Sequence, residues 1–400
     1  MPAHAFGAEG AMKSPIAKPS AVLFRGEDFL LLSPSEQAYA YRNVDRMFAT
    51  RSIQRGATVA ALPRGREISP LDSNGQPVPV DDVMARTRTA GLLVLKRGEI
   101  VLERYGLGLT EDVRWSTMSM VKSLTSTLVG AALQDGHIVS LEEPVSRYVD
   151  ALRGSAYDDV AIRHLLTMSS GVGWSEDYTD RHSDVNRYSK SLGDKVPGGV
   201  LALMRSLPRV AAPGSRFNYN TGDTYVLGCV VTVATGKTLA QYMSETFWTS
   251  LRMEQDAFYT LESEGGQEIG GSRAGMTLRD LGRLGAFLCG DGIVNGRRIL
   301  PETWLDEAGR RHFAVEPTMN SFGATGYGYS WWIPTEGGMA AVGFAGQSLV
   351  IDRRTGSVIV TLACRPQPPF EAAYGIDFKT EATAFRQALL RSLMDVAAAR

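Results

Sequence analysis

The sequence predicts an α/β fold of the α+β type, in which helices flank an antiparallel sheet and a mostly helical lobe is inserted into the chain. Two observations predict this fold. Strand-like runs occur toward both ends of the sequence, whereas helical or loop-like segments fill its middle. The chain also has 400 residues, more than one hydrophobic core usually spans. We therefore expect two lobes with a cleft for a small molecule between them.

Three segments follow from this interpretation. Residues 1–85 are rich in Pro, Gly and Ser, which predicts an extended arm packed on the body, with a short helix near residues 35–48. Residues 86–135 and 265–400 are expected to form the α/β lobe together. Residues 136–264 are expected to form the mostly helical lobe, because their apolar residues recur at helical spacing in several short stretches.

Individual elements are readable from periodicity and turn residues. A hairpin is expected over residues 91–105 and a second one over 347–364, turned at Arg354, Thr355 and Gly356. Further strands are expected at 327–333 and 339–344. Helices are predicted at 117–134, 162–168, 199–206, 224–234, 239–251, 277–288 and 381–398. Thr277 is placed to cap the helix at 277–288, with Asp280 three residues later.

The composition argues against several classes of function. The chain has 42 basic and 43 acidic residues, a formal net charge of −1, so no long-range field attracts nucleic acid or an anionic membrane. We expect a small-molecule partner, and a homodimer is compatible with this composition. The first 20 residues lack the apolar core of an export signal, and no run approaches 18 apolar residues. This predicts a cytoplasmic location. The three cysteines, which are far apart, fit neither a zinc site nor a disulfide framework.

Ser119 and Lys122 form a Ser-x-x-Lys pair at the start of the predicted helix 117–134. The spacing puts the hydroxyl and the amine on one face of the helix, one turn apart. A serine hydroxyl becomes nucleophilic when a base removes its proton, and burial can keep a lysine neutral enough to be that base. Two fixed positions also recur by chance, so an ordinary helix with a surface Ser and Lys is the alternative.

Tyr219 lies in a loop just before a predicted helix, where its phenol could reach the Ser–Lys pair and pass a proton to a leaving group. A structural tyrosine bonded to backbone is the alternative for this residue. Two further segments accompany it, the His-Leu-Leu-Thr run that begins at His164 and the glycine-rich turn at residues 343–347.

In this order the four motifs resemble the family that joins class C β-lactamases, D-alanyl-D-alanine peptidases, family VIII esterases and nylon-oligomer hydrolases. The resemblance covers roughly residues 85–390 and implies the β-lactamase/transpeptidase-like fold. It is strongest to the 6-aminohexanoate-dimer hydrolase branch, on the residues Ser119, Lys122, Glu176-Asp177-Tyr178, Tyr219, Trp331-Trp332 and Ala345-Gly346-Gln347.

Two departures from the family pattern bear on the substrate. The β-lactamases have Tyr-x-Asn, but here Thr221 stands at the third position. They also carry Lys-Thr-Gly on an edge strand, where the lysine helps to hold a substrate carboxylate. This chain has Ala341-Val342-Gly343 there, without a cation. Both departures favour an amidase or esterase over an antibiotic-degrading enzyme.

The resemblance implies a serine hydrolase that cleaves a small amide or ester through an acyl-enzyme, with no metal or organic cofactor. The backbone N–H groups of Ser119 and Phe344 would form the oxyanion hole. Residues expected to contact substrate are Tyr178, Asp180, Trp331, Gly343 and Gln347. The alternatives are a β-lactamase or D-Ala-D-Ala carboxypeptidase, and a non-catalytic penicillin-binding-like protein.

The residues do not support a Ser-His-Asp triad or a metal site. The five histidines show no Ser-His-Asp context, and no Gly-x-Ser-x-Gly elbow is present. The acidic run at residues 176–180 lacks histidines at ligand spacing. It is read as a solvated loop, or as a carboxylate that meets the amino end of a substrate.

Overall fold

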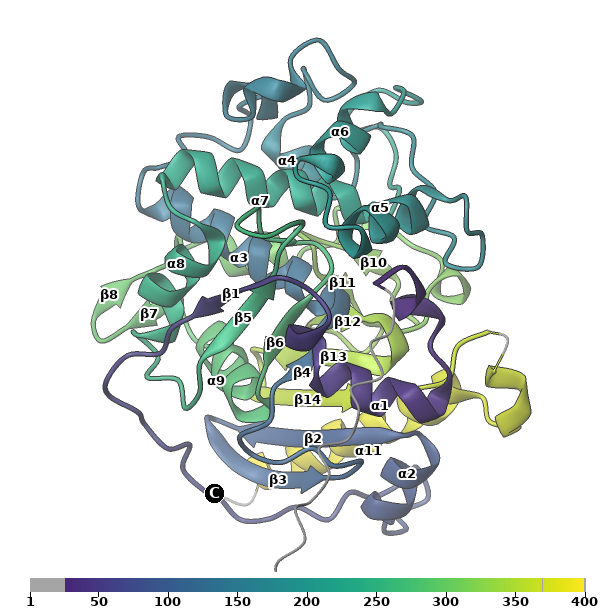
Figure 1. The fold of residues 1–400 in the computed structure, drawn as a ribbon. Coiled ribbons are helices and arrows are strands. Elements are labelled where there is room, and N and C mark those ends of the chain that lie inside the picture. The colour runs from purple at the N-terminus through teal and green to yellow at the C-terminus, as the bar shows by residue number, and fades with distance from the viewer. Residues whose placement is uncertain (1–25, 369, 399–400) are drawn as a thin grey trace, which may run out of the picture.

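A large antiparallel sheet forms the base of the molecule in a computed structural model that describes residues 26–368 and 370–398. Its strand order is β3-β2-β14-β13-β12-β11-β10-β9, so strands from both ends of the chain share one sheet, as predicted (Figure 1). The strands are β2 (Thr89–Lys96), β3 (Glu99–Tyr105), β9 (Phe313–Ala314), β10 (Gly326–Tyr327), β11 (Trp332–Ile333), β12 (Met339–Gly343), β13 (Gln347–Asp352) and β14 (Ser357–Ala363).

Helices cover both faces of this sheet. Successive side chains of a strand point to opposite faces, and in β2 all four residues from Leu92 to Leu95 are fully buried. Leu93 and Leu95 pack in one core that includes residues of α9 (Leu278–Cys289), whereas Leu92 and Val94 pack in a second core with α11 (Phe378–Ala398). A continuous apolar run in β2 is therefore what a strand buried on both faces requires.

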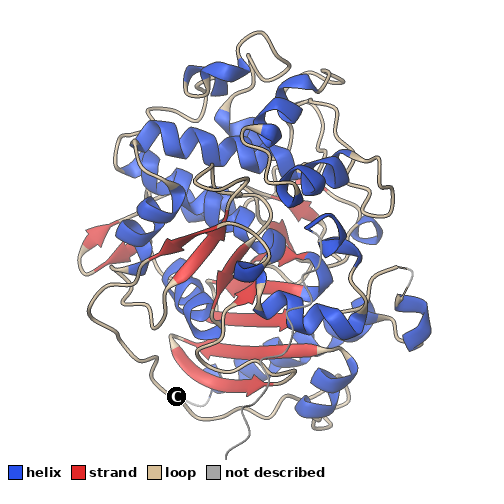
Figure 2. Cartoon of the chain, in the orientation of Figure 1, coloured by secondary structure: helices blue, strands red, loops and turns tan. Residues whose placement is uncertain are grey.

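The middle of the chain forms a mostly helical region above the sheet (Figure 2). Its helices are α3 (Val121–Gln134), α4 (Ile162–Leu166), α5 (Asp184–Gly193), α6 (Gly199–Ser206), α7 (Thr221–Thr235) and α8 (Leu239–Met243), the last continued by a π-helical turn, Ser244–Trp248. The helix α5 was not predicted. In the described part of the chain, no helix combines the length and the apolarity needed to span a membrane.

A second, smaller sheet with the strand order β1-β5-β6-β4 was missed by the sequence analysis. Its strands have two to four residues each, too few to show a period: β1 (Thr50–Ile53), β4 (Trp115–Ser116), β5 (Ala257–Thr260) and β6 (Ala274–Met276). The sheet joins the N-terminal arm to the segment that leads into the Ser-x-x-Lys turn. The arm also carries α1 (Pro34–Arg42) and α2 (Val80–Arg86), and its residues 1–25 lie outside the described residues.

The single strand predicted at residues 327–333 is wrong. The chain turns between β10 and β11, which pair antiparallel with each other. The Gly328 N–H donates to the Trp331 carbonyl at 2.8 Å, and Ser330 has a φ of 60°. Four residues in a tight turn break the strand alternation that the pattern suggested. A hairpin of β7 (Ile293–Val294) and β8 (Arg297–Arg298) and the helix α10 (Trp304–Ala308) complete the α-helices and β-strands of the described ranges.

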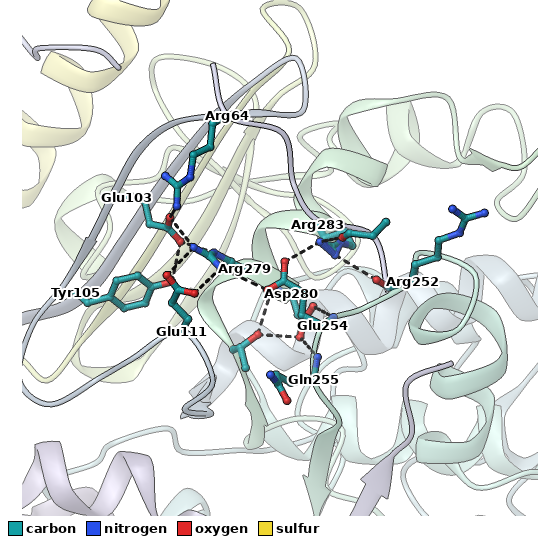
Figure 3. A network of polar contacts seen from close by, with 12 residues as sticks. Arg64, Glu103, Tyr105, Glu111, Arg252, Glu254, Gln255, Arg279, Asp280 and Arg283 are labelled. Atoms are coloured by element: carbon teal, nitrogen blue, oxygen red, sulfur yellow. Dashed lines mark hydrogen bonds and ion pairs between the residues drawn. The ribbon is translucent and has the colours of Figure 1, made fainter. Parts of the chain in front are cut away.

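The start of α9 is held by a network of charged groups, drawn in Figure 3. The Thr277 hydroxyl accepts from the Asp280 N–H, as the capping pattern predicted, and the Asp280 carboxylate accepts from the Glu254 and Gln255 N–H groups. Arg279 donates to both carboxylate oxygens of Glu103 on β3, at 2.6 and 3.0 Å. This network links α9 to β3, the edge strand of the large sheet.

Replacing Arg279 by Met should lower the free energy of unfolding by about 1–3 kcal/mol, because the Glu103 carboxylate, whose side chain is 5% exposed, loses its bidentate partner and keeps the bonds from Arg64 and Tyr105. Arg153→Met is the matched control, since the Arg153–Asp150 pair is exposed and its loss should change stability by less than about 0.5 kcal/mol. Urea unfolding measures both, and equal effects for the two variants would contradict the assignment.

Candidate active site

A cavity of about 740 Å³ opens at Ser119 and extends over the end of β12 toward α11. The end near Ser119 is bounded by one flank from the helical region and one from the large sheet. From the helical region come Glu176, Tyr178 and Tyr219, and from the sheet come Trp332 and the segment 342–348.

Ser119 lies in a 3-10 turn, Met118–Met120, that joins β4 to α3. Met118 immediately before it has a φ of 48°, a left-handed conformation that is uncommon for a residue with a side chain. Such strain persists only where the surroundings impose it, and it is concentrated at functional sites. The turn leaves Ser119 partly exposed to the cavity, whereas both of its neighbours are buried.

Lys122 follows one turn later and is 1% exposed. Its Nζ lies 3.0 Å from the Ser119 Oγ and 2.9 Å from the Thr221 Oγ1, and it also donates to the Gly271 carbonyl. A Cβ at Gly271 would lie 2.5 Å from the Thr221 carbonyl oxygen, so a glycine is needed for this close approach. Burial lowers the pKa of Lys122 to about 8, while the charge of Glu176 acts in the opposite direction.

Glu176 and Thr221 form a second layer behind this amine. The Thr221 hydroxyl and the Tyr178 hydroxyl both donate to Glu176 Oε1, and the Thr221 N–H donates to Oε2 at 3.1 Å. The Trp174 indole N–H also donates to Oε2. From the sequence, the run that contains Glu176 is expected to be a solvated loop or to meet the amino end of a substrate, and Thr221 is only a departure from the Tyr-x-Asn pattern. No local pattern joins them, because 45 positions separate them.

Tyr219 is brought to the same point by the loop that precedes α7. Its ring centroid lies 5.1 Å from the Lys122 Nζ, and its ring packs on Trp332 at 5.4 Å between centroids. Burial raises the pKa of Tyr219 well above its ordinary value, Glu176 raises it further, and a hydrogen bond with Ser119 opposes the rise. The phenol is therefore protonated at neutral pH. Ser119, Lys122 and Tyr219 thus meet at one end of the cavity.

The turn after β12 closes the other side of Ser119. A Cβ at Gly343 would lie 2.6 Å from the Thr117 carbonyl oxygen, so only glycine lets this strand approach the Ser119 turn so closely. Phe344 follows, lines the cavity and contacts the Tyr178 ring at 5.1 Å between centroids. Ala345 has a φ of 59° and Gly346 a φ of 94°, so the chain reverses sharply before β13.

Gln347 lines the cavity, and its side-chain amide also holds this turn. Its Nε2 donates to the Phe344 and Ala363 carbonyls, and its Oε1 accepts from the Trp115 Nε1 and the Ala363 N–H. All four hydrogen-bonding positions of the amide are therefore used within the protein, and the residue is fully buried. Gln347 therefore supports the position of Phe344, and its contact with substrate stays a prediction.

Two of the predicted contacts do not reach the cavity. Trp331 is 1% exposed in the core, because it belongs to the turn between β10 and β11, and its neighbour Trp332 lines the cavity in its place. Asp180 is exposed and accepts a hydrogen bond from the His182 N–H, outside the cavity wall. Tyr178 and Gly343 do line the cavity. Over the residues that the structure describes, no group of three or more His, Cys, Asp and Glu side chains is placed to hold a metal ion.

Comparison with known proteins agrees with this arrangement. The family model for Beta-lactamase matches residues 80–384. The chain is 31% identical over 306 residues to the 6-aminohexanoate-dimer hydrolase of Paenarthrobacter ureafaciens, covering 73% of this chain and 77% of that protein. It is 23% identical over 184 residues to a β-lactamase of Pseudomonas fluorescens, covering 44% of this chain and 48% of that protein.

Solved structures show the same fold. A candidate 6-aminohexanoate-dimer hydrolase from Bacillus anthracis superposes with a TM-score of 0.80 at 22% identity, over 95% of this chain and 99% of that one. A family VIII carboxylesterase gives a TM-score of 0.57 at 15% identity, over 82% of this chain and the full length of the other. The β-lactamase/transpeptidase-like fold is thereby confirmed. With a family model that matches three quarters of its length, the chain belongs to the β-lactamase family and is a serine hydrolase.

Proposed function

We propose that the chain cleaves a small amide or ester through an acyl-enzyme on Ser119, with Lys122 as the base and Tyr219 as the proton donor to the leaving group. The observation that carries this proposal is the set of hydrogen-bond partners around the Lys122 amine. It leaves one direction open for the lone pair of a neutral amine, and that direction is toward Ser119.

The three contacts of the amine differ in what they can donate. The Gly271 carbonyl can only accept, and the Thr221 hydroxyl gives its proton to Glu176. A neutral Lys122 therefore points its two N–H groups at Gly271 and Thr221. Its lone pair then faces the Ser119 hydroxyl at 3.0 Å, the one partner with a proton to give. Glu176 thus acts through Thr221 as a positioning residue.

The chemistry follows in two stages. Lys122 takes the Ser119 proton while the oxygen attacks the substrate carbonyl, and the N–H groups of Ser119 and Phe344 stabilise the oxyanion. Each such donor contributes about 3–4 kcal/mol of barrier reduction. Tyr219 donates its proton to the departing amine or alcohol and regains one from Lys122, next to its ring. Water then attacks the acyl carbonyl and gives a proton to the same pair. The bond between the acyl group and the Ser119 Oγ breaks, the pair passes that proton to the Oγ, and the acid leaves.

The substrate class rests on the cavity wall and on the relatives. The strand β12 offers Ala341, Val342 and Gly343 where the β-lactamases carry Lys-Thr-Gly, so the usual cation beside the scissile bond is absent from this described strand. The rings of Tyr219 and Trp332, which both line the cavity, pack on each other at 5.4 Å between centroids and suit an aliphatic chain. The relative from Paenarthrobacter ureafaciens is, by its name, a hydrolase of the 6-aminohexanoate dimer.

The cytoplasmic location expected from the sequence is part of the proposal. Cys229, Cys289 and Cys364 are all free thiols, which suits a reducing compartment.

Ser119→Ala should abolish the burst of p-nitrophenol from p-nitrophenyl acetate and prevent labelling by a fluorophosphonate probe. Ser215→Ala is the control, because that hydroxyl is exposed and bonds only within its own turn. Turnover of a 6-aminohexanoate dimer, a p-nitrophenyl ester and nitrocefin, compared side by side, identifies the preferred class. Faster turnover of nitrocefin than of the other two would favour a β-lactamase, and full activity of Ser119→Ala would exclude the mechanism.

The activity should rise with pH because the base must be neutral. The pKa of Lys122 is about 8, so kcat/KM for a neutral ester should increase about tenfold per pH unit below pH 8 and level off above it. The measurement is a pH–rate profile between pH 6 and 10. A profile that is flat from pH 6 to 9 would contradict a lysine base.

Glu176→Gln should shift the rise in this profile to lower pH. The charge of Glu176 raises the pKa of Lys122, so its removal leaves burial unopposed and the pKa falls further. Glu302→Gln, an exposed residue away from the cavity, should leave the profile in place. A shift to higher pH, or none, would mean that Glu176 does not act on Lys122.

A further inference from the structure

The cavity continues beyond the catalytic end, and its far part contains an arginine that the proposed mechanism does not use. Arg365 follows β14, and its N–H donates to the Ala345 carbonyl at 2.9 Å. Its side chain crosses Gly346, where a Cβ would lie 2.5 Å from the Arg365 Nε. Gly346 comes two residues after Phe344, so their Cα atoms are at most about 7 Å apart. The guanidinium therefore lines the same cavity as Ser119, next to the turn that carries the proposed oxyanion donor.

This guanidinium has no carboxylate partner among the described residues. Its Nε is shielded from solvent and makes no hydrogen bond there. The ion pairs within the described ranges include Arg354 with Asp352 and Arg386 with Glu336, but none for Arg365. Burial, with the nearby charge of Arg386, lowers the pKa of Arg365 to about 10, so the side chain is still cationic at neutral pH. A shielded and unpaired charge is unfavourable, which makes this position a candidate for an anionic ligand.

The neighbouring charges favour the same sign of ligand. Lys379 and Arg386 also line this part of the cavity. Because Arg386 is paired with Glu336, two cations, Arg365 and Lys379, stand against one carboxylate of the wall, Glu371. The Lys379 amine donates to the Pro317 carbonyl, which leaves its charge uncompensated by that bond. Glu176, the other carboxylate on the cavity wall, lies at the opposite end and is occupied by Thr221, Tyr178 and Trp174. The far part of the cavity is thus positively charged although the whole chain is nearly neutral.

We propose that Arg365 forms the carboxylate subsite of this hydrolase, so that its preferred substrates are amides or esters with a carboxylate a few bonds from the scissile carbonyl. The proposal rests on the proposed function and narrows its substrate class. A guanidinium binds a carboxylate through two parallel N–H···O bonds, and the partly enclosed position strengthens them. The carboxylate can belong to the acyl part or to the leaving group.

The experiment compares pairs of substrates with carbon chains of equal length, one ending in a carboxylate and the other in a methyl group. For the acyl part, the pair is mono-p-nitrophenyl adipate and p-nitrophenyl hexanoate. For the leaving group, it is N-butyryl-6-aminohexanoate and N-butyryl-hexylamine. Arg365→Met should lower kcat/KM for the anionic member of one pair by about 10- to 100-fold, mainly through KM, and change the neutral member by less than about twofold. Arg365→Lys should recover part of the loss, because it restores the charge without the planar fork.

Arg354→Met is the matched control, since that arginine is exposed and lies outside the cavity wall. Fluorophosphonate labelling of Ser119 in every variant confirms that the fold and the nucleophile are intact. Equal losses for both members of each pair would mean that Arg365 is structural, and no loss for either would mean that the substrate does not reach it. Both outcomes overturn the proposal.

A binding measurement separates this proposal from the proposed function. Adipate should bind to Ser119→Ala in calorimetry and at least tenfold more weakly to Ser119→Ala/Arg365→Met. If the wild-type chain hydrolyses none of the four substrates but adipate binding depends on Arg365, the proposed function fails and the anion site stands. If the neutral substrates are hydrolysed and adipate binds equally well with and without Arg365, the carboxylate subsite is excluded and the proposed hydrolase function is supported.

Discussion

The burial of the Lys122 amine is the constraint on which the rest of the site depends. An ammonium group with 1% exposure loses its hydration, and only three oxygen atoms replace it. Those oxygens come from three parts of the chain: the turn before α3, the start of α7 and the loop before β6. The lowered pKa is the consequence, because desolvation penalises the charged form more than the Glu176 charge supports it. Any packing change that admitted water would restore an ordinary lysine.

The two sheets and the helical region are arranged to keep this point enclosed. The small sheet carries β4 directly into the Ser119 turn, and its neighbour β6 follows the loop that presents Gly271. The large sheet brings the end of β12 against the same turn, and glycine at 343 allows that contact. The buried amide of Gln347 then holds the reversal after β12 from behind. Residues with no direct contact to a substrate therefore determine where Ser119, Lys122 and Phe344 lie.

The sequence predicted what depends on local spacing and failed where distant segments meet. Ser119 and Lys122 share one helical turn, and the large sheet and most helices follow from periodic apolar runs. Trp331 was misassigned because strand alternation was assumed across a four-residue turn. Asp180 was misassigned because the type of a side chain does not reveal its partners. Glu176 and Thr221 meet across 45 positions of the sequence, and no local pattern encodes such a contact. Arg365 is distinguished by an Nε without a hydrogen-bond partner among the described residues, which a sequence does not show either.

The place of the unpaired cation determines what length of substrate the cavity suits. A lysine on β12 would lie beside the scissile bond, as a compact bicyclic substrate with an adjacent carboxylate requires. Arg365 instead comes from the end of β14 and crosses Gly346, two residues past the proposed oxyanion donor. An anion held there needs a spacer of several atoms from the reacting carbonyl, and the aromatic flank of Tyr219 and Trp332 offers an apolar surface for such a spacer. The strand β12 has no lysine beside the scissile bond, and Arg365 lies farther away. Together these two features favour a flexible, extended substrate over a compact ring.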